Sequence, residues 1–212
     1  MPDWSKLIEA KTKLARRGAP PGKQGPNLRV PPGLKEVTDF PVLDLGLRPD
    51  LSTDNWQLRL FGRVQNQTSL SFAQFSALPQ VTSVSDFHCV THWTQLDMRW
   101  EGVAAVELVK LGRPQDDAGH VTLHGADDYT TNLPLEALLD DDVLLAHRVN
   151  GEILSPDHGG PVRLVVPKRY GWKSAKWITG IEFHIDDRPG FWEERGYHNE
   201  ADPWKEQRFS GS

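Results

Sequence analysis

The chain has 212 residues, of which 38% are hydrophobic and 25% are charged, and its formal net charge is −5 at pH 7. This size allows one domain with a sizeable core or at most two small domains, and the composition is typical of a soluble globular protein. No run of the sequence approaches the roughly 20 apolar residues that a membrane helix requires. The acidic balance also argues against general nucleic-acid binding.

A single cysteine, Cys89, excludes an intramolecular disulfide. The N-terminal segment contains the paired arginines Arg16 and Arg17, but no apolar stretch follows them. We therefore expect no export signal, and the cytoplasm is the predicted location.

Residues 1–35 differ from the rest of the chain because they are rich in Lys, Arg, Pro and Gly. The segments PPGKQGP and PPG interrupt regular structure there. We predict a short N-terminal helix followed by an extended arm. Such an arm can be disordered, wrap a partner or wrap its own domain, and the pattern does not choose between these. Residues 36–212 are predicted to form the domain itself.

The first strong pattern of the domain is the alternation in WQLRLFG, residues 56–62, which indicates a half-buried strand. A turn around residues 66–67 would bring the chain back. Residues 71–79 then place apolar side chains on one helical face, with Ser71 as the N-cap and Pro79 as the stop.

The later elements alternate between strands and short helices. Asn150-Gly151 between two apolar runs is a strong hairpin signal, and Gly112 is expected to close a helix. In chain order we predict a helix over 103–114, a strand over 120–125, a short helix over 133–141, the hairpin over 143–154, strands over 161–167 and 178–185, and an irregular C-terminal wrap over 186–212. Short strands in hairpins mixed with isolated helices predict an α+β fold with a mixed, largely antiparallel sheet.

The segment from His158 to Ile181 concentrates positive charge in an acidic chain. It contains no acidic residue, and its basic residues are Arg163, Lys168, Arg169, Lys173 and Lys176. Glycines at 159, 160 and 171 allow close approach of the backbone, and amide groups beside Lys and Ser suit a phosphate. The spacing is not that of a Walker loop. A solvated hairpin with basic side chains explains the charge run equally well.

Cys89 lies in SDFHCVTHWT, between His88 and His92. The residue types allow three roles: an inert buried side chain, a nucleophile activated by one of the histidines, or a thiolate metal ligand. The three residues are too tightly clustered for a tetrahedral zinc site. A metal that brings most of its ligands on an organic cofactor needs only one protein sulfur, and spacing leaves these roles open. We expect Cys89 at a strand end or in a loop, with His88 facing the opposite side.

The remaining histidines give weaker signals. His147 and His184 alternate with apolar neighbours and are expected to be solvent-facing strand residues, while His124 fits a pocket or the surface. The eight tryptophans are expected in the core or in pocket walls.

The sequence CVTHW, followed far downstream by DHGGPVRLVVPKRYGWKSAKWI, resembles the molybdopterin-binding domain of the sulfite oxidase superfamily. The downstream motif is specific because it combines G-x-P-x-R-x-x-x-P, Y-G-x-K and K-W-I in this order and spacing. The resemblance runs from about Trp56 to Trp204. It implies the sulfite oxidase-type α+β fold and a molybdenum–molybdopterin cofactor held through a pterin dithiolene and one cysteine thiolate.

The resemblance also implies roles for single residues. Cys89 matches the one protein sulfur on molybdenum. Tyr197, in WEERGYHN, matches an active-site tyrosine that can donate a hydrogen bond or relay a proton. The positions that match the family's pterin contacts are His158, Arg163, Ser174, Ala175 and Lys176.

Two anion-binding features of sulfite oxidases are missing from the sequence. An arginine follows the cysteine closely in that family, whereas this chain has HWT, and the family's Arg-Asn-His segment is absent upstream. We expect protonated His92 or Arg99 to replace these groups in part. His92 and Tyr197 are therefore predicted catalytic residues, and Trp93 is expected to line the same pocket.

These features predict two-electron oxygen-atom transfer on a small-molecule substrate, which would be a sulfoxide, an N-oxide or sulfite. The family's dimerisation and haem domains are absent from the sequence, so we expect electrons to pass through a separate protein. One alternative is a molybdopterin-binding carrier without turnover, which the missing arginines suggest. The other is a Cys-His hydrolase, for which a third triad member is lacking.

Overall fold

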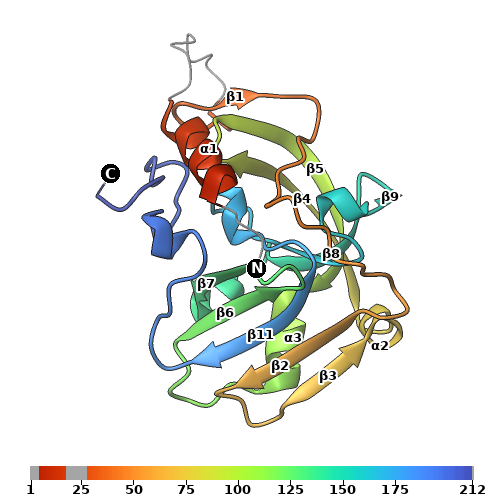
Figure 1. Ribbon diagram of the computed structural model, residues 1–212. Helices are drawn as coiled ribbons and strands as arrows, with labels where there is room; N and C mark the ends of the chain where they lie inside the picture. Colours follow the sequence, from red (N-terminus) through yellow and green to blue (C-terminus); the bar gives the residue numbers. More distant parts are fainter. Residues whose placement is uncertain (1–4, 18–27, 212) are drawn as a thin grey trace.

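The computed structural model describes residues 5–17 and 28–211, and it contains two β-sheets (Figure 1). Most strand pairs are antiparallel, and the parallel pairs make both sheets mixed. The predicted α+β class with mixed, largely antiparallel sheets is therefore confirmed. None of the helices in the described ranges is both long enough and apolar enough to cross a bilayer.

The first sheet has the order β1-β5-β8-β10, with β4 beside β5 and β9 beside β8. A long antiparallel hairpin, β4 and β5, dominates this sheet and fills the upper half of Figure 1. The strands of this first sheet are β1 (Lys35–Glu36), β4 (Gln80–Cys89), β5 (Trp93–Ala104), β8 (Leu144–Val149), β9 (Glu152–Ile153) and β10 (Arg163–Val165).

The second sheet has the order β3-β2-β11-β6-β7 and fills the lower half of Figure 1. Its central strand, β11, runs parallel to β2 and antiparallel to β6. The strands are β2 (Gln57–Gly62), β3 (Thr68–Ser71), β6 (His120–Gly125), β7 (Thr130–Pro134) and β11 (Ile178–His184). Buried apolar side chains from both sheets form one continuous core.

Short helices connect the strands. The α-helices are α1 (Ser5–Arg16), α2 (Phe72–Ser76), α3 (Ala105–Gly112) and α4 (Leu135–Leu138), and the 3₁₀ turns are η1 (Pro156–His158), η2 (Gly171–Lys173) and η3 (Glu193–Arg195). The predicted N-cap of α2 is confirmed, because Ser71 Oγ accepts a hydrogen bond from the backbone N–H of Gln74 at 3.3 Å. Gln74 Oε1 accepts one from Ser71 N at 2.9 Å, which completes a capping box.

The predicted hairpin at Asn150-Gly151 is also confirmed. Both residues have positive φ, 52° and 84°, which is the geometry of the tight turn that favours this pair. The strand over 56–62, the turn after it and the strand over 120–125 are present as expected.

Two predicted helices are longer than the observed ones. The helix expected over 103–114 begins only at Ala105, because the two residues before it pair with β8. Gly112 is its last helical residue, and the left-handed residue that ends it is Arg113, with φ 51°. The helix expected over 133–141 is reduced to α4, because the start of that range belongs to β7.

The expectation that His184 faces solvent is wrong. His184 is only 3% exposed, and its Nε2 lies 3.1 Å from Thr122 Oγ1 on the neighbouring strand. His147 and His124 are half-buried: His147 contacts Gln80 at the start of β4, and His124 contacts Glu182 on the neighbouring strand β11.

The predicted N-terminal helix is confirmed as α1, and it lies on its own domain. Leu7 and Ile8 pack against the core, and Ala15 is buried in it. The arm predicted after this helix falls mostly on residues 18–27, which lie outside the described residues.

Candidate active site

A cavity lies where loops from the ends of both sheets meet. It holds about 910 Å³ of space between the atoms, counting the open solvent at its mouth. Its walls come from the end of β4 with the turn after it, the turn between β6 and β7, the segments 40–45 and 158–177, the C-terminal segment 192–197 and helix α1.

Cys89 is the last residue of β4 and lines this cavity, as expected for a cysteine at a strand end. Its Sγ lies 3.1 Å from Thr91 Oγ1. Burial raises the pKa of the thiol, while this hydrogen bond and the charges of Lys11 and Lys176 oppose the rise. The cavity therefore presents one soft sulfur donor between two cations.

His88 lies on the opposite face of β4, as predicted. Its Nδ1 lies 3.0 Å from Thr94 Oγ1, and burial lowers the pKa of His88 to about 4. The ring is therefore neutral at pH 7 and has no hydrogen bond with Cys89.

His92 does not reach the cavity, although it was predicted as a catalytic residue. Its positive φ of 70° turns the side chain away in the tight turn after Cys89. Its Nε2 lies 2.8 Å from the carbonyl oxygen of Ala15, and its Nδ1 lies 3.0 Å from that of Gly33. Because carbonyls only accept hydrogen bonds, a ring N–H of His92 is the donor in such a contact. His92 thus anchors α1 to the domain.

Arg99, the other predicted replacement for an anion-binding arginine, is also outside the cavity. Its side chain is 55% exposed and pairs with Glu101 at 3.5 Å. Trp93 does line the cavity, as expected.

Arg163 is a buried cation facing the cavity. It is 2% exposed, and its guanidinium donates to the carbonyl oxygens of His158 at 3.0 Å and Ser174 at 3.1 Å. It has no carboxylate partner within the described part of the chain. Burial lowers the pKa of Arg163 to about 9, which still leaves it charged at pH 7. An uncompensated buried cation is costly and favours an anionic ligand beside it.

Lys176 lies at the same end of the cavity. Its Nζ donates to the carbonyl oxygen of Asp157 at 2.6 Å. Burial, and next the charge of Arg163, lower the pKa of Lys176 to about 7. Gly159, with φ 100°, packs against it so closely that a Cβ there would lie 2.8 Å from Lys176 Cβ. This contact explains the glycine of the motif.

The other predicted cofactor-binding residues also line the cavity: His158, Ser174 and Ala175. The ring of His158 stacks on Phe40 with centroids 4.3 Å apart. Its Nε2 donates to the carbonyl oxygen of Phe40 at 2.9 Å, so its Nδ1, 3.0 Å from Ser155 Oγ, is the acceptor. The neutral tautomer agrees with the pKa of His158, which burial lowers.

The remaining basic residues of this segment point elsewhere. Lys168 pairs with Asp140 at 3.3 Å, and Arg169 pairs with Glu200 at 3.3 Å. Some of the basic residues in this segment thus line the cavity, as an anion site requires. Others form ion pairs outside it, as ordinary charged side chains do.

Tyr197 lines the cavity together with two tryptophans. Its ring lies 5.2 Å from that of Trp172 and 4.8 Å from that of Trp192. Burial raises the pKa of Tyr197 to about 12, although a hydrogen bond with the Thr12 side chain lowers it. The phenol is therefore protonated at neutral pH and available as a donor.

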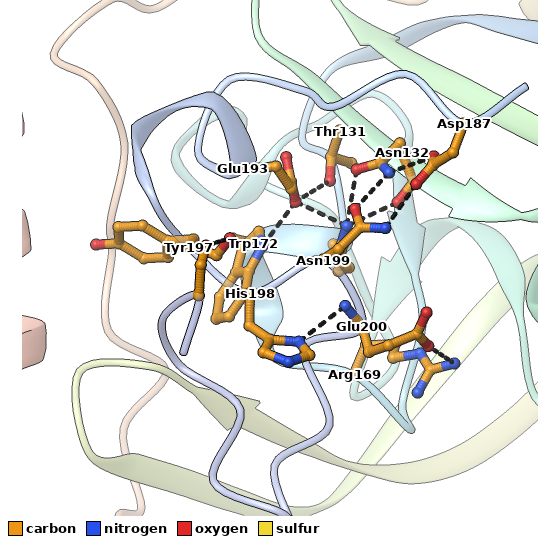
Figure 2. Close-up of polar contacts among 12 residues, drawn as sticks. Thr131, Asn132, Arg169, Trp172, Asp187, Glu193, Tyr197, His198, Asn199 and Glu200 are labelled. Atoms are coloured by element: carbon orange, nitrogen blue, oxygen red, sulfur yellow. Dashed lines mark hydrogen bonds and ion pairs between the residues drawn. The ribbon is translucent and has the colours of Figure 1, made fainter. Parts of the chain in front are cut away.

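A buried polar network stabilises the segments that carry these aromatic residues (Figure 2). Lys173 Nζ lies 2.7 Å from Glu193 Oε1, and both side chains are at most 2% exposed. The same carboxylate oxygen accepts hydrogen bonds from Trp172 Nε1 at 2.9 Å and Thr131 Oγ1 at 3.1 Å. The network joins η2, η3 and β7, and so fixes the C-terminal segment next to the cavity.

Several charged and polar residues of the cavity were not predicted from the sequence, namely Lys11, Asp44, Asp127 and Tyr129. A signal for Lys11 is present, because it shares one helical face with Leu7 and Ala15 at spacings of four residues. The acidic residues carry no comparable sequence pattern.

The donor set agrees with a metal that arrives on an organic cofactor. The described residues include no group of three or more His, Cys, Asp or Glu side chains placed to hold a metal ion. One thiol lines a cavity that the cations Arg163 and Lys176 also line. This arrangement fits a metal with ligands of its own and an anionic group attached.

Comparison with known proteins gives a consistent result. The family described as "oxidoreductase molybdopterin binding domain" matches residues 45–192. A Bacillus subtilis (strain 168) protein named uncharacterized oxidoreductase YuiH is 45% identical over 185 residues, with 86% of this chain and 92% of that protein covered.

Two further similarities cover smaller parts of longer proteins. The protein-methionine-sulfoxide reductase catalytic subunit MsrP of Campylobacter jejuni is 26% identical over 181 residues, which cover 75% of this chain and 61% of MsrP. The crystal structure of the sulfane dehydrogenase SoxCD from Paracoccus pantotrophus shares the fold, with a TM-score of 0.61 and 24% identity over 66% of this chain and 41% of that one. This chain thus spans less than two thirds of either protein.

Proposed function

Since the chain belongs to the oxidoreductase molybdopterin-binding domain family and is a molybdopterin-dependent oxidoreductase, we propose that it catalyses two-electron oxygen-atom transfer on a small molecule. Its cofactor is molybdenum–molybdopterin. The substrates we propose are sulfoxides, N-oxides or sulfite. The names of MsrP and SoxCD agree with sulfur chemistry.

The observation that carries this proposal is the single thiol of Cys89 in a cavity that is also lined by the buried Arg163 and by Lys176. When bound, the cofactor supplies the two-electron redox chemistry. Cys89 would be the protein ligand to the metal, because a thiolate suits a metal already bound by sulfur. Metal binding would displace the proton of a thiol whose pKa burial raises.

The cofactor's anionic group would lie against Arg163 and Lys176, beside His158, Ser174 and Ala175. Charge-assisted hydrogen bonds from a guanidinium and an ammonium suit a phosphate. Tyr197 would hold its proton at the phenol oxygen and donate a hydrogen bond toward the reacting group.

Two other functions are less well supported. A carrier without turnover is favoured by one observation, that Arg99 and His92 both lie outside the cavity. A Cys-His hydrolase requires a histidine within hydrogen-bond reach of the thiol. In the described structure the Sγ of Cys89 contacts Thr91, while the rings of His88 and His92 contact other groups.

Electrons would leave or enter through a separate protein, and we keep the cytoplasm as the proposed location. A pull-down with the cofactor-loaded protein and cell fractionation test these two points directly.

The test of the function is elemental and kinetic. Protein purified from a host with an intact cofactor pathway should contain about one molybdenum and one pterin per chain. It should oxidise a reduced dye with a sulfoxide or N-oxide, or reduce one with sulfite. Replacing a residue that hydrogen-bonds to a metal ligand typically lowers activity roughly 10- to 100-fold. Cys89→Ser removes the proposed ligand itself, so it should lower activity by more than this while still retaining pterin.

Thr91→Val is a matched control, because it removes only the hydroxyl beside the sulfur. Full activity in Cys89→Ser would rule out the ligand assignment. Bound molybdenum with no reactivity toward any of these substrates would favour the carrier instead.

A further inference from the structure

Helix α1 closes one side of the cavity and is attached to the domain at several points. The carbonyl oxygen of Ala15 accepts from His92 at 2.8 Å. The guanidinium carbon of Arg16 lies 4.6 Å from the centre of the Phe209 ring, and Leu7 packs on the core. The helix is thus a built part of the site.

Lys11 of this helix lines the cavity and is half-buried. In residues 5–17 and 28–211 it makes no hydrogen bond or ion pair. Burial lowers the pKa of Lys11, while the nearby charges of Asp44 and Cys89 raise it. The amine is therefore close to the predicted metal ligand without being held by it.

The other cations of the cavity are already engaged. Arg163 donates to three carbonyl oxygens, and Lys176 donates to the carbonyl oxygen of Asp157. Both lie at the end proposed for the cofactor's anionic group. Lys11 differs because its ammonium has all its hydrogen-bond donors available for a bound molecule.

A second donor, the phenol of Tyr197, lines the same cavity as Lys11 and Cys89. Its pKa responds to the Thr12 side chain of α1 and to Cys89, so the phenol lies near both. The ammonium and the phenol therefore face one cavity together with the cysteine, where substrate would approach. Charged and neutral donors together suit an oxygen atom that carries negative charge.

We propose that Lys11 is a specificity-determining residue, which makes the enzyme prefer small oxyanions to neutral sulfoxides or N-oxides of similar size. The inference rests on the proposed function, since it names the substrate class of the same site. In this proposal, Lys11 of α1 supplies the positive charge that neither His92 nor Arg99 brings to the cavity.

The first test measures binding and needs no turnover. Sulfate is titrated into the cofactor-loaded protein, and the fluorescence of the tryptophans that line the cavity reports occupancy: Trp93, Trp172, Trp177 and Trp192. We expect Lys11→Met to weaken sulfate binding at least tenfold and Lys11→Arg to retain most of it. Lys13→Met is the matched control, because Lys13 lies on the exposed side of the same helix, and it should stay within twofold of wild type.

The second test compares substrates. In Lys11→Met, kcat/KM should fall at least tenfold for sulfite and less than threefold for a neutral sulfoxide. Unchanged sulfate affinity, or equal losses for both substrates, would overturn the proposal. So would loss of pterin and molybdenum from Lys11→Met, because Lys11 would then serve cofactor retention.

These outcomes separate the two proposals. A wild-type protein that turns over none of the substrates contradicts the proposed function, whereas the sulfate titration still decides the role of Lys11. If Lys11→Met fails to fold, Lys11→Gln with the same two measurements replaces it.

Discussion

Arg163 and Lys176 lie at one end of the cavity, and neither has a carboxylate partner in the described structure. Burying a charge without a partner is unfavourable, and backbone carbonyls offset only part of this cost. An anion bound in the cavity would therefore offset this free-energy cost. Without the cofactor, the cost of the buried charges lowers the stability of the protein.

The pKa of Lys176, about 7, predicts that anion binding depends on pH. Below pH 7 the amine is charged and holds an anion, and the charge is lost as the pH rises. In cofactor-free protein the Kd for phenyl phosphate should therefore rise up to about fivefold between pH 7 and pH 8. A phosphate monoester is already largely dianionic there, and Asp127, with a pKa of about 6, is already ionised.

Isothermal titration calorimetry measures this dependence. Lys176→Arg keeps its charge throughout the range and should flatten the curve, while the exposed Lys168→Met should leave it unchanged. The same slope in Lys176→Arg as in wild type would contradict the assignment.

Single residues of the site differ in how far the sequence predicts them. The sequence motifs contain Cys89, Arg163 and Lys176, and all three residues line the cavity in the structure. His92 follows the same motif, yet a positive φ in the turn sends its ring toward α1. Lys11 reaches the cavity only because α1 folds back onto the domain: its spacing from Leu7 and Ala15 places it on the packed face of the helix, but does not tell which part of the domain that face meets.

At the scale of elements, η2 and η3 are joined by the buried pair of Lys173 and Glu193. Removing one partner leaves an uncompensated buried charge, so Lys173→Met or Glu193→Leu should each lower the free energy of unfolding by about 3–5 kcal/mol. The double variant should be less destabilised than the sum of the two. Urea denaturation with a double-mutant cycle measures this coupling.

The exposed pair of Lys168 and Asp140 is the control, since breaking such a surface pair costs at most about 1 kcal/mol. Additive effects of the two buried substitutions would show that the pair is not coupled. In that case another contact would hold the C-terminal segment and Tyr197 in place.

The elements with strong local signals were predicted well. The capping residue Ser71 and the Asn150-Gly151 turn act through neighbouring backbone groups, so their structure follows from a few residues. The long β4–β5 hairpin was not predicted as such, because most of the first half of β4 is exposed and shows no alternation. The ends of α3 and α4 were misplaced because strand pairing with distant residues claims those positions.

At the scale of the whole molecule, the division into two sheets depends on contacts that no local pattern carries. Strand β11 completes the second sheet by pairing with β2, a strand from the other end of the domain. Arg163 lies in β10 of the first sheet, which also holds Cys89, whereas Lys176 lies just before β11 of the second sheet. The fold class follows from the sequence pattern, whereas the position of the cavity depends on how the chain joins the two sheets between β10 and β11.

Because Arg163 and Lys176 have no carboxylate partner in the described structure, the cofactor should stabilise the entire domain. A ligand present at 1,000 times its Kd adds about 4 kcal/mol to the free energy of unfolding. For a chain of this size that corresponds to a rise in Tm of about 8–16 °C. Differential scanning calorimetry of protein from hosts with and without the cofactor pathway tests the rise.

Arg163→Met should reduce the difference in Tm between loaded and cofactor-free protein, because the substitution acts on both forms. It removes the buried charge that destabilises the cofactor-free form, and it removes a hydrogen-bond donor from the loaded form. Lys168→Met, outside the cavity, should leave the difference intact. Equal Tm values for loaded and cofactor-free wild-type protein would mean that the cations are compensated without an anion, and the physical basis for placing the cofactor there would be lost.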